Sequence, residues 1–508
     1  MKYDVIVVGS GMGGMTAAAL CGLIGMKVLI VEKHKVFGGM TVPFKIKGRR
    51  FNAGLHWFNW PARGQDNYEK IWTLLSGGGA PWVKLPDDVE RFLHNGKEFI
   101  RPNGHKEYQD QLVDLFPNEK KKIIRYLKDI RNISEDFDHY CGYQCLRETK
   151  VGKRAKSILG NLVRKFDKVT VREYFDTNGF STELQNHLAY TWDNYGLPPN
   201  LASFTMHAFF AWDSLNGSYI QKNSAMDISK SFRNTIKKNN GEVITGHGVE
   251  DFLVKDGTIQ GVLLDDGRCY ESEAVISTIG FFETFEKLEH KYQPRSLNLI
   301  KSLREFYSFV VLNYCLDEQS SSSKSVPKGN YFVFDGVDSV DVTDWEELEK
   351  NQPQHFNYVN IHENQHSAQV IATVNTKHFY KWKETQLGNR GDDYVEYKEL
   401  LANQVEDLVE SVFPGFSNHV IHRNVSTPLS IEHYTSHMKG LCYGVGAYTG
   451  RYNLEDLKPV TPIKGLLLGG QDVCSPGVVG AFLGGLMAVS TLTRKNVVKE
   501  ALKLCEGR

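Results

Sequence analysis

A glycine-rich turn between a short apolar run and a helix constrains the fold of this chain more than any other feature. The run from Asp4 to Val8 is typical of a buried parallel strand, and the next residues, Gly9-Ser10-Gly11-Met12-Gly13-Gly14, fit the pattern G-x-G-x-x-G. In this pattern Gly9 makes a tight turn, Gly11 lets the backbone approach a pyrophosphate, and Gly14 lets the helix pack closely on the strand. The segment therefore predicts a Rossmann-type dinucleotide-binding unit.

An acidic residue ends the second expected strand of this unit. Lys27 to Val31 is another apolar run, and Glu32 follows it, where a carboxylate is placed to accept both hydroxyls of an unphosphorylated ribose. The start of the intervening helix offers N–H groups and partial positive charge to the phosphates. We expect Glu32 and the adjacent Lys33 to contact the nucleotide, and the acid favours NAD or FAD over NADP.

A second glycine pair favours FAD over a nicotinamide cofactor. The pair follows Glu32 after a few residues, and a protein that holds FAD in an extended form needs it, because its chain must pass close beneath the cofactor. The residues expected to contact FAD here are Gly38, Gly39, Met40 and Thr41.

The C-terminal part of the sequence supplies a matching half. Ile463 to Leu468 predicts a buried strand, and Pro476-Gly477 opens an apolar helix from Val478 to Leu492. We expect Asp472 to meet the ribityl or pyrophosphate part of FAD, and the positive end of the helix to point at the flavin N1/C2 carbonyl. Val249 would offer backbone contacts to the adenine, and the other predicted FAD-binding residues are His56, Gly280, Gly470, Gly477, Val478 and Val479.

Short strands in the middle of the chain predict how the domains are divided. Between Glu242 and Thr278 they are separated by Asp256-Gly257 and Asp266-Gly267, both hairpin signals, so a three-stranded meander is expected. The predicted fold class is α/β: a discontinuous Rossmann-type FAD-binding domain with a mixed α+β substrate domain. The FAD-binding domain would take residues 1–75, 217–290 and 440–508, and the substrate domain residues 76–216 and 291–439.

Composition excludes several classes of protein. The chain is 41% hydrophobic and 24% charged, which is typical of a soluble globular protein, and its 60 basic and 60 acidic residues create no net field toward nucleic acid. Eight cysteines without a C-x-x-C pair, and a first strand that begins at once without a signal peptide, predict a cytoplasmic location. The longest apolar stretch, about residues 477–492, is too short to span a membrane.

Taken together, these residues resemble the phytoene desaturase, carotenoid isomerase and retinol saturase flavoproteins of the amine-oxidase-like superfamily. The segment from Val8 to Gly39 resembles all three groups, whereas Gly54-Leu55-His56-Trp57 resembles the G-I-H-Y of the retinol saturases. Gly470-Gln471-Asp472 also resembles the saturase ending, and Ser426 to Leu429 resembles the T-P-L segment of the family. The resemblance implies FAD, a polyene or other conjugated lipophilic substrate, and carbon–carbon redox chemistry or isomerisation.

Two segments depart from the family pattern. Lys222-Asn223-Ser224-Ala225 stands where the family commonly has Gly-Gly, and Ser436 to Gly440 replaces the stretch A-P-R-G. The second departure places more polar side chains near the substrate, so the substrate need not be a retinoid or a carotenoid.

Three residues are candidates for moving a proton. Changing the saturation of a C–C bond is hydride chemistry that a flavin carries, so the protein must supply position, dryness and a proton donor or acceptor. His56 is the first candidate because the ordinary pKa of histidine lies near working pH. Tyr434 and His437 are second candidates, from the resemblance of their segment to the flavin-facing part of the family. The structural alternatives are a backbone-bonded loop histidine at 56, core packing at Tyr434 and a solvated loop at His437.

A literal zinc motif is interpreted as chance. His362 to His366 reads H-E-x-x-H, but zinc binding needs a helix that places both imidazoles on one face. The flanking residues 356–361 and 368–374 are strand-like, so a turn is expected and no metal site is predicted.

Residues 147–165 form a basic, partly apolar segment. The segment contains seven basic residues and one acidic residue, Glu148. Apolar residues stand among them at roughly helical spacing: Ile158, Leu159, Leu162 and Val163. A basic amphipathic helix is one way for a soluble enzyme to reach a lipid-dissolved substrate, so peripheral contact with anionic membranes is predicted. A solvated surface helix is the alternative.

The sequence therefore predicts an FAD-dependent oxidoreductase that acts on carbon–carbon bonds of a small hydrophobic substrate, with saturation favoured over desaturation and no nucleic-acid partner. Three alternatives stay open: a redox-neutral, flavin-dependent cis–trans isomerase of a polyene, an amine oxidase-like flavoenzyme, and a non-enzymatic prenyl-lipid carrier of the same fold.

Overall fold

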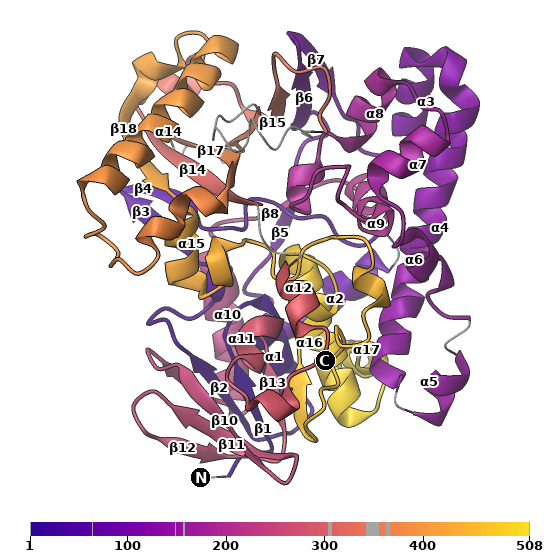
Figure 1. The fold of residues 1–508 in the computed structure, drawn as a ribbon, viewed down its shortest axis with the longest axis vertical. Helices are drawn as coiled ribbons and strands as arrows, with labels where there is room; N and C mark the ends of the chain where they lie inside the picture. Colours follow the sequence, from indigo (N-terminus) through magenta and orange to yellow (C-terminus); the bar gives the residue numbers. More distant parts are fainter. Residues whose placement is uncertain are drawn as a thin grey trace.

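A five-stranded parallel sheet brings together segments from three distant parts of the chain (Figure 1). The computed structural model describes residues 2–62, 64–147, 149–155, 158–302, 307–341, 355–361 and 366–506. Neighbouring strands of the sheet run parallel. In spatial order they are β19 (Leu466–Leu468), β13 (Val275–Ser277), β1 (Val5–Val8), β2 (Val28–Glu32) and β9 (Glu242–Thr245).

Both faces of this sheet are buried, which explains why its strands read as continuous apolar runs. Val5 and Val7 of β1 pack against a layer of helices, whereas Ile6 and Val8 pack against a second, smaller sheet. The helices of the first layer are α1 (Met12–Leu23), α10 (Met226–Lys238) and α16 (Gly477–Thr493). The predicted strands at the start of the chain and the glycine turn between strand and helix are therefore confirmed.

The smaller sheet is the predicted three-stranded meander. Its antiparallel strands are β10 (Val249–Lys255), β11 (Thr258–Leu264) and β12 (Cys269–Glu271). Asp256 and Gly257 at its first turn have φ values of 49° and 71°, the positive values that a type I′ hairpin requires. The strand predicted from Ile463 is shorter than expected, because Gly465 has a φ of 86° and breaks the extended run before β19.

A seven-stranded mixed sheet forms the second half of the molecule (Figure 1). Helix α14 (Asp392–Val412) covers one face of it, where Val310, Leu312 and Val370 belong to the shared core. In spatial order the strands are β18 (Val420–Ser426), β14 (Tyr307–Leu316), β17 (Ser367–Asn375), β16 (His355–Asn360), β15 (Gly329–Phe334), β6 (Glu90–His94) and β7 (Lys97–Ile100).

A helical layer adjoins this sheet, on the right in Figure 1, around an aromatic-rich core. Its main helices are α3 (His105–Leu115), α4 (Lys120–Leu146), α7 (Val171–Thr177), α8 (Thr182–Ala189) and α9 (Phe204–Ser214). Among the described residues, no single helix is both long and apolar enough to cross a membrane. One pair, α16 with α17 (Val497–Glu506), meets that length and composition when taken together, but the pair is bent by 100°.

The smaller elements connect these layers. Strands β3 (Pro43–Ile46) and β4 (Arg49–Asn52) form a hairpin, and β5 (Trp82–Lys84) pairs with β8 (Tyr219–Gln221). The remaining α-helices within the described residues are α2 (Gln65–Leu75), α5 (Lys150–Ala155), α6 (Asn161–Phe166), α11 (Phe281–Phe285), α12 (Leu297–Ser302) and α15 (Pro428–Thr435).

The two large sheets take their strands from different predicted domains. The parallel sheet uses residues from the 1–75, 217–290 and 440–508 segments, and the seven-stranded sheet uses residues from the 76–216 and 291–439 segments. The exact domain boundaries stay a prediction.

The basic segment is not the one continuous helix that its spacing predicted. It forms two short helices, α5 and α6, with Gly160 between them at a φ of 71°. A Cβ on Gly160 would lie 2.8 Å from the Tyr140 side chain, so the chain turns sharply there against α4. Glu148, Lys156 and Ser157 lie outside the described residues.

The zinc-like motif also falls largely outside them. Residues 362–365 are not described, but the strands on either side, β16 and β17, are present as expected. His366 of the motif lies beside the loop after β14, with its Nδ1 3.2 Å from the Asp317 carbonyl oxygen.

Candidate active site

A cavity of about 1670 Å³ extends from the glycine turn to the seven-stranded sheet. At one end it is lined by Gly9 to Gly13, Glu32 and Val249, and at the other by Phe309 and Ile371. The carboxyl ends of β1 and β2 open onto the first end, where parallel α/β sheets bind their ligands. The cavity therefore joins the predicted nucleotide site to the predicted substrate domain.

The glycine turn is shaped by close backbone contacts. Gly9 has a φ of 93° and donates its N–H to the Val31 carbonyl at 2.8 Å. A Cβ on Gly14 would lie 1.9 Å from the Gly9 carbonyl oxygen, so no side chain fits there. Gly11 differs, because its Cβ would meet nothing within 4 Å and it lines the cavity. This is the arrangement expected where backbone approaches a phosphate.

The two ends of the chain meet at this turn. A Cβ on Gly13 would lie 2.7 Å from the Cα of Gly470, and a Cβ on Gly485 would lie 2.5 Å from the Gly13 carbonyl oxygen. Helices α1 and α16 thus pack at the closest range that backbone allows. Gly470, Gly477 and the adjacent Val478 line the cavity beside the turn.

Glu32 is held by hydrogen bonds that the sequence did not foresee. Its Oε2 accepts from the N–H and the hydroxyl of Ser10 at 2.8 and 2.6 Å, and its Oε1 accepts from the N–H of His34 at 2.7 Å. The Ser10 hydroxyl also accepts from the N–H of Gly38 at 2.8 Å. Ser10 therefore fixes the carboxylate and the second glycine pair together. Nζ of Lys33 donates to the Ser436 hydroxyl at 3.2 Å, and both residues line the cavity.

The second glycine pair lies against the first turn. Gly38 and Gly39 have φ values of 129° and 55°, and a Cβ on Gly39 would lie 2.9 Å from the Cα of Gly11. Met40 and Thr41 follow and line the cavity. The chain thus passes close to the turn at the predicted place, while its contact with FAD stays a prediction.

Asp472 lies behind the cavity wall, where its carboxylate joins three segments. It is 4% exposed and accepts 2.7 Å hydrogen bonds from the N–H groups of Phe281 and Val445. Gly280 precedes the first of these, with a φ of 120°, at the start of α11. Neither Asp472 nor Gly280 lines the cavity, and Val479, on α16, is half-buried and packs against the core of the helical layer. Their direct contact with FAD stays a prediction, and the observed role of Asp472 is to brace the site.

The three proton-transfer candidates line the same cavity. His56 is half-buried, with its ring 6.1 Å from that of Trp57. His437 is half-buried too, and its Nδ1 lies 3.1 Å from the Leu441 carbonyl oxygen. Tyr434 is 57% exposed with its ring against His34, so the alternative of core packing for it is wrong.

Sequence reasoning missed a buried polar cluster beside the cavity. Asp193, which lines the cavity, lies 3.3 Å from Nε2 of His355 and accepts a hydrogen bond from the Thr373 hydroxyl at 3.2 Å. These residues are far apart in the sequence, and only the pairing of β16 with β17 brings two of them together. No local pattern could have identified them.

Burial keeps two other cavity groups neutral. Part of each side chain faces the cavity, but removal from water raises the pKa of Cys442 to about 12 and raises the pKa of Tyr443 well above its ordinary value. Cys442 therefore presents a neutral thiol, and Tyr443 a neutral phenol, to the cavity.

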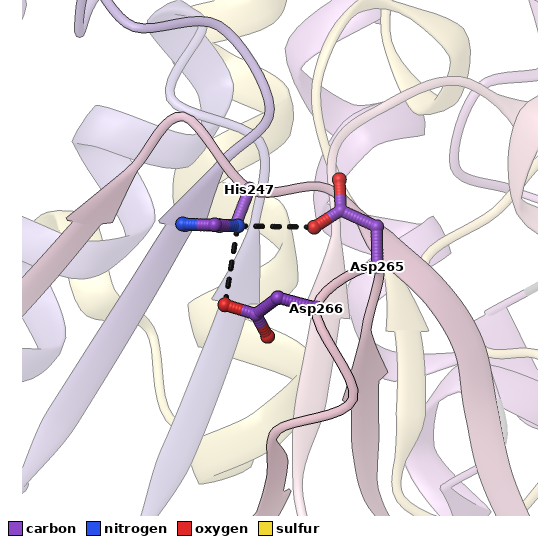
Figure 2. Close-up of side chains that lie close together, drawn as sticks. All are labelled: His247, Asp265 and Asp266. Atoms are coloured by element: carbon purple, nitrogen blue, oxygen red, sulfur yellow. Dashed lines mark hydrogen bonds and ion pairs between the residues drawn. The ribbon is translucent and has the colours of Figure 1, made fainter.

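Near the nucleotide end, Figure 2 shows His247, Asp265 and Asp266, a group that could in principle hold a metal ion. Nδ1 of His247 lies 3.1 and 3.2 Å from the two carboxylates. Asp265 accepts from the N–H of Gly248, which is the main cause of its lowered pKa, and Asp266 pairs with Arg268 at 2.6 Å. Because these exposed carboxylates already have partners, the group braces the loop that carries Val249 to the cavity.

Comparison with known proteins agrees with this geometry. A family of NAD(P)-binding Rossmann-like domains matches residues 7–76. The chain is 26% identical to the all-trans-retinol 13,14-reductase of Danio rerio, over 99% of this chain and 88% of that protein. It is 23% identical to the chloroplastic prolycopene isomerase of Daucus carota, over 96% of this chain and 79% of that protein.

Solved structures share the whole fold. Cyclohexylamine oxidase from Brevibacterium oxydans IH-35A has a TM-score of 0.60 and 14% identity, with 97% of this chain and 99% of that chain covered. The predicted fold class and the predicted resemblance to the retinol saturase and carotenoid isomerase flavoproteins are confirmed.

Proposed function

We propose that this homologue of the retinol saturases and carotenoid isomerases is an FAD-dependent oxidoreductase that reduces a carbon–carbon double bond in a hydrophobic, conjugated molecule. The observation that carries the proposal is the continuity of the cavity, which reaches from Gly11 in the glycine turn to Ile371 in the seven-stranded sheet. A dinucleotide in the first part would bring its reactive end to a substrate in the second.

The residues around the cavity fit FAD. Gly11 and Gly477 both line it, and a Cβ on either would meet nothing within 4 Å, which leaves room for a ligand against bare backbone. Gly9 to Gly13 would hold the pyrophosphate, Glu32 the ribose and Val249 the adenine. When bound, FAD supplies hydride transfer at its flavin N5.

The chain itself would position the substrate, exclude water and move one proton. Phe309, Val311 and Ile371 give the substrate end an apolar wall that suits a polyene. His56 is the proposed proton donor to the second carbon, because it lines the cavity and histidine is the residue type that most often transfers protons near neutral pH.

Reduction is favoured over the other chemistries by the similarity to all-trans-retinol 13,14-reductase along the whole chain. Redox-neutral isomerisation is the second candidate, because the chain is also similar to prolycopene isomerase. An amine oxidase has less support, since the likeness to cyclohexylamine oxidase shows the fold alone. A carrier without flavin would not need the bare backbone of Gly11 and Gly477.

Anaerobic flavin spectroscopy tests the proposal. The purified chain is reconstituted with FAD, reduced with dithionite and mixed with all-trans-retinol as the probe. Re-oxidation of the flavin together with a dihydro product on chromatography would support reduction. An isomerised product without re-oxidation would support the second candidate. Failure of the chain to retain FAD would overturn both.

The predicted cytoplasmic location and the contact of residues 147–165 with membranes also remain proposals. Arg154 and Ile158 are exposed on this segment, which suits contact with an anionic lipid surface. Arg147 is engaged in an ion pair with Glu455 at 2.8 Å.

A further inference from the structure

One part of the cavity wall lies beside β18, the edge strand of the seven-stranded sheet. The segment that leads into α14 and the start of α15 are joined there. The Tyr394 hydroxyl lies 2.7 Å from the Thr427 hydroxyl, and Nη2 of Arg390 donates to the Leu429 carbonyl at 3.4 Å. Val395 of α14 also lines the cavity and is 50% exposed, so the cavity opens to solvent in this region.

Arg390 is a nearly buried cation in this opening. It is 9% exposed and lines the cavity. Its Nη1 donates to the Trp382 carbonyl at 3.2 Å and to the carbonyl and hydroxyl of Thr385 at 2.9 and 3.0 Å, which are all neutral acceptors. It forms no ion pair with the described residues, and its Nε is unpaired there but not enclosed, in contrast with Nε of Arg91. The guanidinium is therefore oriented without being neutralised, whereas buried cations usually have an acidic partner.

Lys398 adds a second positive charge beside the first. It is half-buried, lines the cavity and forms no ion pair with the described residues. Its Nζ lies 5.9 Å from the centre of the Tyr394 ring, and Cζ of Arg390 lies 5.6 Å from the same centre. The neighbouring Glu399 is already paired with Arg423 at 2.6 Å. Because the two cations repel each other, an anion bound near both would stabilise the opening.

The acidic residues of the cavity wall lie elsewhere. Within the described chain, those that line the cavity are Glu32, Asp193, Glu250, Asp265, Glu283 and Glu286, and none belongs to α14, β18 or α15. Asp392 and Glu396 of α14 and Glu432 of α15 do not line it. The opening is therefore cationic.

An apolar wall adjoins this cationic opening. Val311 lines the cavity and pairs with Ser426 of β18, and Ile431 of α15 lines it from the other side of the opening. Arginine donates in parallel to the two oxygens of a carboxylate or a phosphate, and lysine adds a point charge. The matching ligand has an anionic end group on a hydrocarbon chain, because a neutral end group would leave both cations uncompensated.

We propose that Arg390 and Lys398 bind the anionic end group, a carboxylate or a phosphate, of an amphipathic conjugated substrate whose hydrocarbon chain lies in the cavity. The inference rests on the proposed function for the position of the chain. It adds the chemical class of the substrate, which differs from the neutral alcohol that the name of the similar all-trans-retinol 13,14-reductase contains.

Two ligands of one shape test the charge directly. All-trans-retinoate carries a carboxylate, and its methyl ester keeps the polyene without the charge. Binding to the FAD-loaded protein is followed by quenching of tryptophan fluorescence, since Trp57 lines the cavity. At low salt we expect the Kd of retinoate to be about 10-fold lower than that of the ester, and the ratio to shrink at about 1 M salt, where ion pairs are screened. Equal affinity for acid and ester would overturn the proposal.

Variants of the two cations assign the effect. Lys398→Met should reduce the preference for retinoate to about 3-fold or less, and Lys398→Glu should reverse it. Arg390→Lys keeps the charge but loses the planar fork, so it should weaken retinoate and leave the ester unchanged. Lys237→Met is the matched control, because it removes one charge from α10, outside the cavity. Thermal unfolding of each variant confirms that it folds. A preference that survives in both Lys398 variants would contradict the site.

A lipid head group is the other source of such an anion. If Lys398→Met lowers co-sedimentation with phosphatidylserine vesicles but leaves the preference for retinoate unchanged, the cations meet a membrane and the proposal is wrong. Tight binding of retinoate that does not re-oxidise the dithionite-reduced flavin would make it an inhibitor and overturn its assignment as a substrate.

Flavin content separates failure of this proposal from failure of the proposed function. A chain that retains FAD and reduces all-trans-retinol, but binds retinoate no better than the ester, would refute only the anionic site. A chain that prefers retinoate but retains no FAD would refute only the proposed function.

Discussion

The five-stranded sheet and the seven-stranded sheet face the same cavity in different ways. At the parallel sheet the cavity is bounded by backbone, and glycines such as Gly13 and Gly470 touch at distances that no side chain permits. At the seven-stranded sheet it is bounded by side chains that alternate with a separate core under α14. Where backbone forms the cavity wall, the close contacts restrict each position to glycine. Where side chains form the wall, a single residue can be replaced without moving the backbone. We therefore expect cofactor binding to tolerate no added methyl group and substrate binding to be adjustable.

Gly14→Ala is the most severe test of the backbone wall. The new Cβ would lie 1.9 Å from the Gly9 carbonyl oxygen and 2.9 Å from the Thr278 hydroxyl, so the turn or α1 must move. Overpacking costs about 1–3 kcal/mol and sometimes more, and we expect a loss of about 3 kcal/mol or more in the free energy of unfolding, measured by denaturant titration. Bound FAD should be lost as well.

Gly142→Ala is the matched control for this change. Gly142 lies within α4, where a Cβ would meet nothing within 4 Å, so this variant should be as stable as the wild type or more so. Equal stability of the Gly14→Ala and Gly142→Ala variants would contradict the claim that close backbone contacts require glycine at the turn.

Gly11→Ala separates binding from folding at the same turn. Gly11 has an ordinary φ of −60°, and its Cβ would meet nothing within 4 Å, so stability should change by less than about 0.5 kcal/mol. The methyl group would nevertheless occupy space where the pyrophosphate is expected. We predict that the Kd for FAD, measured by titration of the apoprotein, rises about 10-fold or more. An unchanged Kd would show that no phosphate lies against Gly11.

The same contrast explains how much the sequence could predict. In the half built on the five-stranded parallel sheet, which we call the nucleotide-binding half, the constraints are local. A strand, a turn, a helix and a second strand lie within residues 4–32, and each close backbone contact requires a glycine that is visible in the sequence. The hairpin at Asp256-Gly257 was predictable for the same reason. Only the length of β19 was wrong, because the positive φ of Gly465 depends on how the strand enters the sheet.

The half that contains the seven-stranded sheet, which we call the sheet-and-helix half, depends on contacts between residues that are distant in the sequence. Asp193 meets His355 and Thr373 only because β16 and β17 pair in one register. The nucleotide-binding half contains one such feature too: the bracing role of Asp472 requires α11 and the Val445 turn to converge on it, although the sequence suggested a cofactor contact. Such contacts depend on the topology of the fold, so no local sequence pattern predicts them.

Ile371→Ala tests whether the side-chain wall is adjustable. Ile371 is half-buried and faces the cavity between Val311 and Asn357. We expect the Kd for all-trans-retinol to rise about 3- to 10-fold, as lost apolar contact implies, while the Kd for FAD stays unchanged. In the control Val370→Ala, on the face under α14, stability should fall by about 1–2 kcal/mol with no change in retinol affinity. A parallel loss of FAD in the Ile371→Ala variant would mean that the two walls are not independent.

Ile158→Asp tests whether the basic segment 147–165 binds to lipid membranes, and we expect it to have the smallest effect of these substitutions. Ile158 is 73% exposed between α5 and α6, on a segment rich in basic residues. Removing one inserted apolar side chain should weaken co-sedimentation with vesicles that contain phosphatidylserine about 5-fold, and neutral phosphatidylcholine vesicles should bind neither form well. Leu400→Asp adds the same charge at a 54% exposed position on α14, outside that segment, and should leave vesicle binding unchanged. If both substitutions reduce binding equally, the added negative charge alone explains the loss, and the basic segment has no special contact with the membrane.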